Sequence, residues 1–100
     1  METRIAATKD VPAGQMLGIE HQDQSIVVAN VDGKFYAIGN ICTHMECMLS
    51  DGILTGEKVE CPCHGSTFDV RTGAVLKGPA DEPEPVFKLT IEGEQILLIT

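Results

Sequence analysis

The chain has 100 residues, the length of one domain, and 43% of them are hydrophobic, so a folded core is expected rather than disorder. Fifteen acidic residues against seven basic ones give a formal net charge of −8, which disfavours nucleic acid and anionic membranes and suits a partner with a basic patch. No apolar stretch is long enough to span a bilayer, and the first residues lack the pattern of a signal peptide. A soluble, cytoplasmic protein is therefore expected.

Short strands are predicted at both ends of the chain. In chain order, the segments rich in Val, Ile and alternating apolar residues are 5–7, 16–19, 25–31, 35–38, 86–91 and 95–99. Asp32-Gly33 separates two of these segments, and this pair accepts the positive φ that a two-residue type I′ turn needs. Glu92-Gly93-Glu94 separates the last two. No segment has a long apolar period of about 3.6 residues, so an all-β fold with little helix is predicted.

The middle of the chain, residues 40–80, has a different composition. It holds all four cysteines, two of the three histidines and five of the ten glycines. Short strands are predicted within it at 53–55, 58–60 and 67–70. The predicted architecture is a single domain of residues 1–100. An antiparallel sandwich or barrel-like base of residues 1–39 and 81–100 would carry a small lobe of residues 40–80.

Two cysteine–histidine pairs stand out in this middle segment. Cys42-Thr43-His44 has the pattern C-x-H, and Cys61-Pro62-Cys63-His64 has the pattern C-x-x-H. A Cys and a His at this spacing on one loop can reach different irons of one small cluster, and two such loops would hold it from both sides. Two thiolates on one iron and two imidazoles on the other are the ligand set of a mixed-ligand 2Fe–2S centre. Gly65, next in the chain, permits close approach of the backbone to inorganic sulfur.

The charge of such a centre predicts its function. Two ferric ions and two sulfides carry two positive charges together, so two thiolates make the oxidised centre neutral, whereas four would leave two negative charges. An electron enters a neutral centre more easily than a dianion. Imidazole ligation therefore raises the reduction potential to about −150 to +300 mV, against about −400 mV for plant-type all-cysteine clusters. The residues thus predict a one-electron carrier.

A closed zinc site with two Cys and two His is the alternative interpretation of the same residues. Zinc sites usually pair residues of one type, as C-x2–4-C and H-x3–5-H, and mixed pairs are unusual there. A secreted disulfide framework is also disfavoured, because the cysteines are interleaved with histidines and no export signal is seen. A cluster is therefore favoured over a zinc-bearing interaction module.

With their flanking residues, the two loops resemble the Rieske iron–sulfur family. The resemblance is carried by Cys42-Thr43-His44, the run CPCHGSTFD from Cys61 to Asp69, Arg71-Thr72-Gly73 and Gly78-Pro79-Ala80. It implies one [2Fe–2S] cluster, with Cys42 and Cys61 on the inner iron and His44 and His64 on the outer iron near solvent. It also implies a Rieske-type β fold over the whole chain, which has the length of a free-standing Rieske ferredoxin.

The resemblance implies roles for further positions. Ser66 would offer its hydroxyl to a bridging sulfide. Cys47 and Cys63 occupy positions that form a disulfide between the loops in Rieske proteins of quinol-oxidising cytochrome bc complexes; two free thiols are the alternative, which a reducing cytosol favours. Phe68 stands where those proteins carry a Tyr whose hydroxyl bonds a ligand sulfur. A reduction potential between that of the quinol-oxidising proteins and that of the ferredoxins of bacterial ring-hydroxylating dioxygenases is therefore expected.

The function implied by the resemblance is that of a soluble ferredoxin, an electron-transfer component that transforms no substrate alone. Its partners would be a flavin-dependent NAD(P)H reductase and a non-haem iron terminal oxygenase, with electron exit at the His44 or His64 edge. Three alternatives stay open: the small Rieske subunit of a nitrite reductase, a respiratory Rieske domain cut from its membrane anchor, and the zinc module. Phe68 and the short loops argue against the respiratory alternative. The sequence contains no phosphate loop, dinucleotide fingerprint or nucleophile arrangement.

Overall fold

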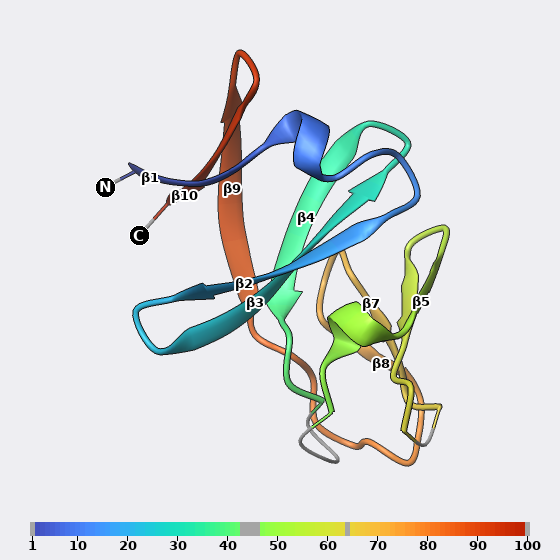
Figure 1. The fold of residues 1–100 in the computed structure, drawn as a ribbon. Coiled ribbons are helices and arrows are strands. Elements are labelled where there is room, and N and C mark those ends of the chain that lie inside the picture. Colours follow the sequence, from blue (N-terminus) through green and yellow to red (C-terminus); the bar gives the residue numbers. More distant parts are fainter. Residues whose placement is uncertain (1, 43–46, 64, 100) are drawn as a thin grey trace.

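The computed structural model describes residues 2–42, 47–63 and 65–99, whose strands form two antiparallel sheets (Figure 1). The strands are β1 (Glu2–Ala7), β2 (Met16–His21), β3 (Gln24–Val31), β4 (Lys34–Gly39), β5 (Ile53–Thr55), β6 (Lys58–Glu60), β7 (Thr67–Asp69), β8 (Val75–Lys77), β9 (Val86–Glu92) and β10 (Gln95–Ile99). Two three-residue 3-10 helices, η1 (Thr8–Asp10) and η2 (Leu49–Asp51), are the helical elements of this part of the chain. Neither they nor any other helix among these residues is long and apolar enough to cross a bilayer. The predicted all-β fold is confirmed.

The larger sheet has six strands in the order β1-β10-β9-β4-β3-β2, and it curls toward a barrel (Figure 1). The hairpin between β3 and β4 turns at Asp32 and Gly33, with φ values of 52° and 90°, as the Asp-Gly pair predicts. The Asn30 side chain braces this turn, because its Oδ1 accepts a hydrogen bond from the Gly33 N–H at 2.8 Å. The first strand is longer than expected, because Glu2 pairs with Ile99 at the end of the chain.

The smaller sheet has four strands in the order β5-β6-β7-β8 and lies at one end of the larger sheet (Figure 1). Its first two strands match the segments expected at 53–55 and 58–60, and the third ends at Asp69. Strand β8 was not anticipated from the sequence. It is a three-residue edge strand, and it pairs with β7 through Thr67 and Lys77. Of the predicted metal ligands, Cys42 lies in the chain that leads into this sheet, and Cys61 lies in the connection between β6 and β7.

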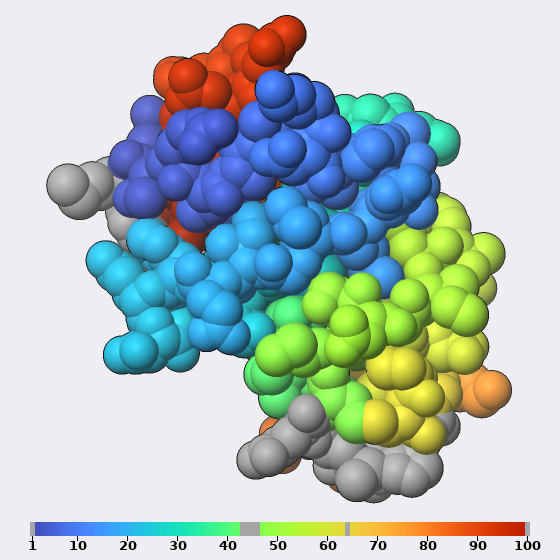
Figure 2. Space-filling view, in the orientation of Figure 1, coloured from blue at the N-terminus to red at the C-terminus, as the bar shows by residue number. Residues whose placement is uncertain are grey.

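Two hydrophobic cores lie on opposite faces of β3, whose residues 26–30 are all buried. Ile26 and Val28 pack with β10 residues inside the curled sheet. Val27 and Ala29 face the other way and join a second core with residues of the smaller sheet. This alternation follows from the period of two in a strand. The second core therefore fixes the smaller sheet on the larger one, and the two parts meet along a broad contact in Figure 2.

Candidate iron–sulfur site

The first candidate ligand loop leaves the end of β4 and returns to η2. Cys42 is 4% exposed and belongs to the core between the two sheets. Its backbone N–H donates to the Cys47 carbonyl at 2.9 Å, and Ile41 and Met48 form a β-bridge one step further out. The loop is thus closed by a short antiparallel ladder. His44, expected at its tip, lies outside the described residues.

The second candidate loop joins β6 to β7 and is closed in a similar way. Cys61, 2% exposed, donates its N–H to the Ser66 carbonyl at 2.7 Å, and the Gly65 N–H donates to the Cys61 carbonyl at 3.2 Å. Gly65 has a φ of 78°, a conformation in which a Cβ is strained, so a glycine is needed here. His64 lies outside the described residues, so its predicted role is not placed by the structure.

A disulfide bond between Cys47 and Cys63 joins the two loops. Their Cα atoms are 6.3 Å apart, and 16 positions separate them in the sequence. The disulfide implied by the resemblance is therefore present in the structure, and the alternative of two free thiols is not. Cys42 and Cys61 remain outside the disulfide, and both are buried.

The Sγ atoms of Cys47, Cys61 and Cys63 lie within 4.8 Å of one another. Three sulfurs this close resemble a metal site, but two of them are consumed by the disulfide and do not offer thiolates. Among the described residues, Cys42 and Cys61 are therefore the cysteines that can supply thiolates to a metal. This donor set, completed by a histidine of each loop, fits a 2Fe–2S cluster with two sulfur and two nitrogen ligands.

The third segment at the site is the chain around Ala80, which packs on Ser66. Ser66 is fully buried, and its Oγ accepts a hydrogen bond from the Ala80 N–H at 3.0 Å. Because a hydroxyl has one proton and two lone pairs, the Ser66 proton remains available to a further acceptor. Ala80 itself is 4% exposed and is part of the core between the sheets.

A charged turn follows the second loop and holds the end of β7. The carboxylate of Asp69 accepts hydrogen bonds from the Arg71 backbone N–H at 2.8 Å, from its Nε at 3.2 Å and from its Nη2 at 3.0 Å. These bonds from Arg71 lower the pKa of the Asp69 carboxyl below its ordinary value of 3.8, although burial opposes the shift. Arg71 also reaches Glu57 at 2.9 Å, with both side chains about half exposed.

Asp69→Asn is expected to lower the free energy of unfolding at pH 7 by about 1–2 kcal/mol, because it removes hydrogen bonds to a charged acceptor. A carboxyl with a depressed pKa in the folded state stabilises the protein above its unfolded pKa, and the benefit is lost as pH falls through the folded pKa. The difference between variant and native protein should therefore shrink below about pH 4. Urea unfolding over a pH series measures it.

Glu57→Gln is the matched control for that experiment, since it breaks only the half-exposed ion pair to Arg71 and should cost little. A destabilisation by Asp69→Asn that stays constant from pH 7 to acid, or that equals the effect of Glu57→Gln, would contradict the assignment.

Two buried polar side chains near the site were not singled out from the sequence. Asn40, 2% exposed, bonds to Ser50 beside the first loop, and Glu84, 5% exposed, lies against Gly39 at the end of β4. Glu84 falls in a run of acidic and proline residues that looks solvated, and no local pattern marks its burial. Asn40 precedes the first C-x-H pair by two positions, and this proximity was the one available signal.

Comparison with known proteins places these loops in a family. The family model described as a Rieske [2Fe-2S] domain matches residues 1–92. The biphenyl dioxygenase ferredoxin subunit of Pseudomonas sp. strain KKS102 is 41% identical over 97 residues, which cover 96% of this chain and 89% of the relative.

Solved structures agree with this relationship. A ferredoxin of Sphingomonas yanoikuyae B1 has a TM-score of 0.94 and 32% identity, over 100% of this chain and 99% of that one. A chain in the complex of reduced oxygenase and oxidized ferredoxin of carbazole 1,9a-dioxygenase has a TM-score of 0.92 and 30% identity, over 97% of this chain and 91% of that one. The protein therefore belongs to the family of Rieske [2Fe-2S] domains, whose cofactor is one 2Fe–2S cluster.

Proposed function

We propose that the chain is the ferredoxin of a multicomponent dioxygenase system, which takes single electrons from a flavoprotein reductase and delivers them to a terminal oxygenase. The observation that carries this proposal is the 41% identity to a biphenyl dioxygenase ferredoxin subunit over nearly the full length of both proteins. A similar chain occurs in a complex of an oxygenase with its ferredoxin. The protein is thus an electron-transfer component and not an enzyme by itself.

The ligands of the cluster are proposed to be Cys42 and Cys61 on one iron and His44 and His64 on the other. Burial of both cysteines outside the disulfide supports the first pair. The histidines are assigned from their spacing in the sequence. When bound, the cluster accepts and releases one electron. We take residues 40–80 as the cluster-binding lobe and residues 1–39 and 81–100 as the base of a single domain.

The protein's own residues are proposed to exclude water from the sulfur side of the site and to supply one hydrogen-bond donor to it. The core between the sheets buries Cys42 and Cys61, so their thiolates are shielded from solvent. The Ser66 hydroxyl, already oriented by the Ala80 N–H, would donate its proton to a sulfur at this site. Such a bond stabilises the additional negative charge of the reduced state.

The docking surface is proposed to lie at the ligand loops. Ile41 and Met48, 38% and 40% exposed, form an apolar pair where the first loop leaves the protein body. The net charge of −8 favours partners that present basic side chains around a small apolar contact. A short-lived complex of this kind suits a carrier that must dock with two partners in turn.

The proposed function rests on a reduction potential in the range of mixed Cys/His ligation. Potentiometric titration should give a one-electron reduction within about −150 to +300 mV, well above the value of about −400 mV for plant-type clusters. Phe68 is fully buried in the core that contains Cys42 and Cys61 and carries no hydroxyl. Phe68→Tyr is expected to raise the potential, because an added donor to a ligand sulfur favours the reduced state.

Phe87→Tyr serves as the control, since Phe87 packs against the other core, which contains neither Cys42 nor Cys61. A native potential near that of all-cysteine clusters would refute the assigned ligand set. A native value at the top of the range, or a lower potential for Phe68→Tyr, would refute the proposal that Ser66 is the main donor.

We propose a cytoplasmic location for the protein, because the proposed reductase oxidises NAD(P)H, which is a cytoplasmic cofactor. Cell fractionation followed by immunodetection tests this location. Recovery in a periplasmic extract would contradict it.

A further inference from the structure

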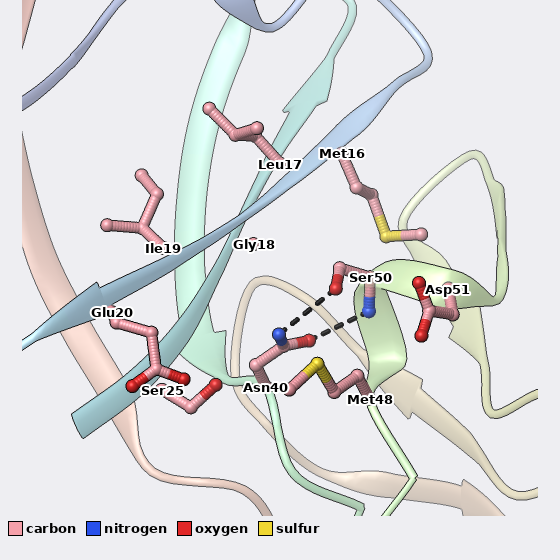
Figure 3. A pocket seen from close by; sticks show the side chains of 10 residues that line it. All are labelled: Met16, Leu17, Gly18, Ile19, Glu20, Ser25, Asn40, Met48, Ser50 and Asp51. Carbon is pink, nitrogen blue, oxygen red and sulfur yellow. Dashed lines mark hydrogen bonds between the residues drawn. The ribbon is translucent and has the colours of Figure 1, made fainter. Parts of the chain in front are cut away.

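Asn40 lies at the base of the first ligand loop and is almost fully buried, with 2% of its surface exposed. Its side chain makes two hydrogen bonds to one residue on the far side of the loop (Figure 3). The Asn40 Nδ2 donates to Ser50 Oγ at 3.0 Å, and the Ser50 backbone N–H donates to Asn40 Oδ1 at 2.7 Å. We call this pair of bonds the Asn40 clasp.

The backbone of Asn40 strengthens the same closure. Its carbonyl accepts a hydrogen bond from the Leu49 N–H at 2.7 Å, and its own N–H donates to the Ser25 carbonyl of β3 at 2.9 Å. Asn40 is therefore bonded to the larger sheet on one side and to η2 on the other. The backbone N–H, the backbone carbonyl, Nδ2 and Oδ1 of Asn40 therefore all take part in hydrogen bonds within the protein.

The clasp surrounds the part of the chain that carries the proposed ligands. Asn40 precedes Cys42 by two positions, and Ser50 follows Cys47 by three. Inside the clasp, the Cys42 N–H bonds to the Cys47 carbonyl. Cys42 and the disulfide partner Cys47 thus both lie between the two residues that the clasp joins.

Strand β2 supports the clasp from behind, and Gly18 provides the necessary space. A Cβ at position 18 would lie 2.7 Å from Ser50 Oγ, which is closer than such contacts occur, and 3.0 Å from Asn40 Nδ2, which is a tight contact. Gly18 therefore serves to admit the two side chains and not to adopt an unusual φ. Gly18, Asn40 and Ser50 all line one pocket beside β2 and η2 (Figure 3).

We propose that Asn40 is a positioning residue for the cluster: through the clasp to Ser50, and with Gly18 making room, it fixes the first ligand loop on the larger sheet. This inference rests on the proposed function only in that it takes Cys42 as a ligand. A buried asparagine that merely stabilised the fold would affect unfolding but not the bound cluster. A positioning residue affects the cluster while the fold persists.

Asn30 is a matched control, because it is also a buried asparagine whose side chain makes two hydrogen bonds, in its case both to backbone groups. It is 6% exposed, its Nδ2 donates to the Val11 carbonyl at 2.7 Å, and its Oδ1 accepts from the Gly33 N–H. It braces the β3–β4 hairpin and touches neither ligand loop. Asn40→Ala and Asn30→Ala thus each remove a buried amide side chain with two hydrogen bonds, the first beside the ligand loop and the second at the β3–β4 hairpin.

The experiment compares the cluster-loaded native protein with Asn40→Ala, Ser50→Ala, Gly18→Ala and Asn30→Ala. The measurements are the rate of iron release to the chelator ferrozine, the EPR g-values of the dithionite-reduced protein, and urea unfolding. Asn40→Ala should release iron about tenfold faster, as expected for the loss of two buried hydrogen bonds, and its g-values should shift. Asn30→Ala should keep native g-values and a native release rate at a similar loss of stability.

The other two variants make the result independent of whether Asn40→Ala folds. Ser50→Ala retains the bond from its backbone N–H to Asn40 Oδ1 and should give a smaller change than Asn40→Ala. Gly18→Ala retains the side chains of Asn40 and Ser50 but displaces Ser50, so it should shift the g-values in the same direction.

Native release rates and native g-values in Asn40→Ala, or in both Ser50→Ala and Gly18→Ala, would overturn the positioning role and leave a structural one. This failure is distinguishable from failure of the proposed function. In the latter case, the native protein itself would contain no iron–sulfur cluster.

Discussion

Replacing Cys42 with alanine is expected to remove the iron–sulfur cluster almost completely while the six-stranded sheet stays folded. Cys42 would supply one of only two thiolates, and a methyl group cannot bind iron. The loss of one buried sulfur leaves a small void, and the core inside the curled sheet does not include this residue. Iron and sulfide analysis should fall from two of each per chain to near zero, with a far-UV circular dichroism spectrum close to native.

The informative control is the double variant Cys47→Ala/Cys63→Ala, which lacks the disulfide but retains both proposed thiolates. It should still bind the cluster, and its unfolding free energy should fall by about 3 kcal/mol, the entropic value for closing a loop of this length. The opposite pattern, with iron kept by Cys42→Ala and lost from the double variant, would assign the metal to the group of Cys47, Cys61 and Cys63.

The second large effect is expected for Phe68→Ala, which should lower the unfolding free energy by about 3–5 kcal/mol. This is a large share of the 5–15 kcal/mol that typically stabilises a domain. Phe68 has 0% exposure and is the largest of the fully buried side chains among the described residues. It packs in the core that joins the two sheets and contains Cys42 and Cys61, so the variant should also lose the cluster readily. Urea unfolding followed by far-UV circular dichroism gives the magnitude.

Phe87→Ala is the control that shows whether the effect of Phe68→Ala belongs to the core between the two sheets. Phe87 is an aromatic residue of the same size, but it is only partly buried and packs against the core inside the curled sheet. Its truncation should cost less and leave iron content unchanged. Equal losses of stability in the two variants would mean that the core between the sheets is not the main support of the lobe.

The elements that the sequence predicted best are those determined by local chemistry. Asp32-Gly33 turns the chain as expected because both residues adopt a positive φ. The alternating residues of β9 and the Val- and Ile-rich β3 were also recognisable, because their patterns need no knowledge of partners. By contrast, β8 is a short and largely exposed edge strand that exists only because β7 lies beside it.

The candidate site divides in the same way. The C-x-H and C-x-x-H pairs were recognisable, because each depends on residues two or three positions apart. The disulfide joins residues 16 positions apart, and it was expected only from the resemblance to the Rieske family. The burial of Asn40 and Glu84 could not be predicted, because it depends on η2 and Gly18 for Asn40 and on the end of β4 at Gly39 for Glu84. An asparagine after a strand usually indicates a turn. Only the tertiary structure shows that this one is bonded to Ser50 across the first candidate ligand loop.

The account depends most directly on the metal content of the purified protein. Iron and acid-labile sulfide should be found at two of each per chain, and dithionite reduction should give the half-integer-spin EPR signal of a coupled iron pair. Colourless protein that binds a single divalent ion, lacks sulfide and gives no EPR signal after reduction would contradict the account.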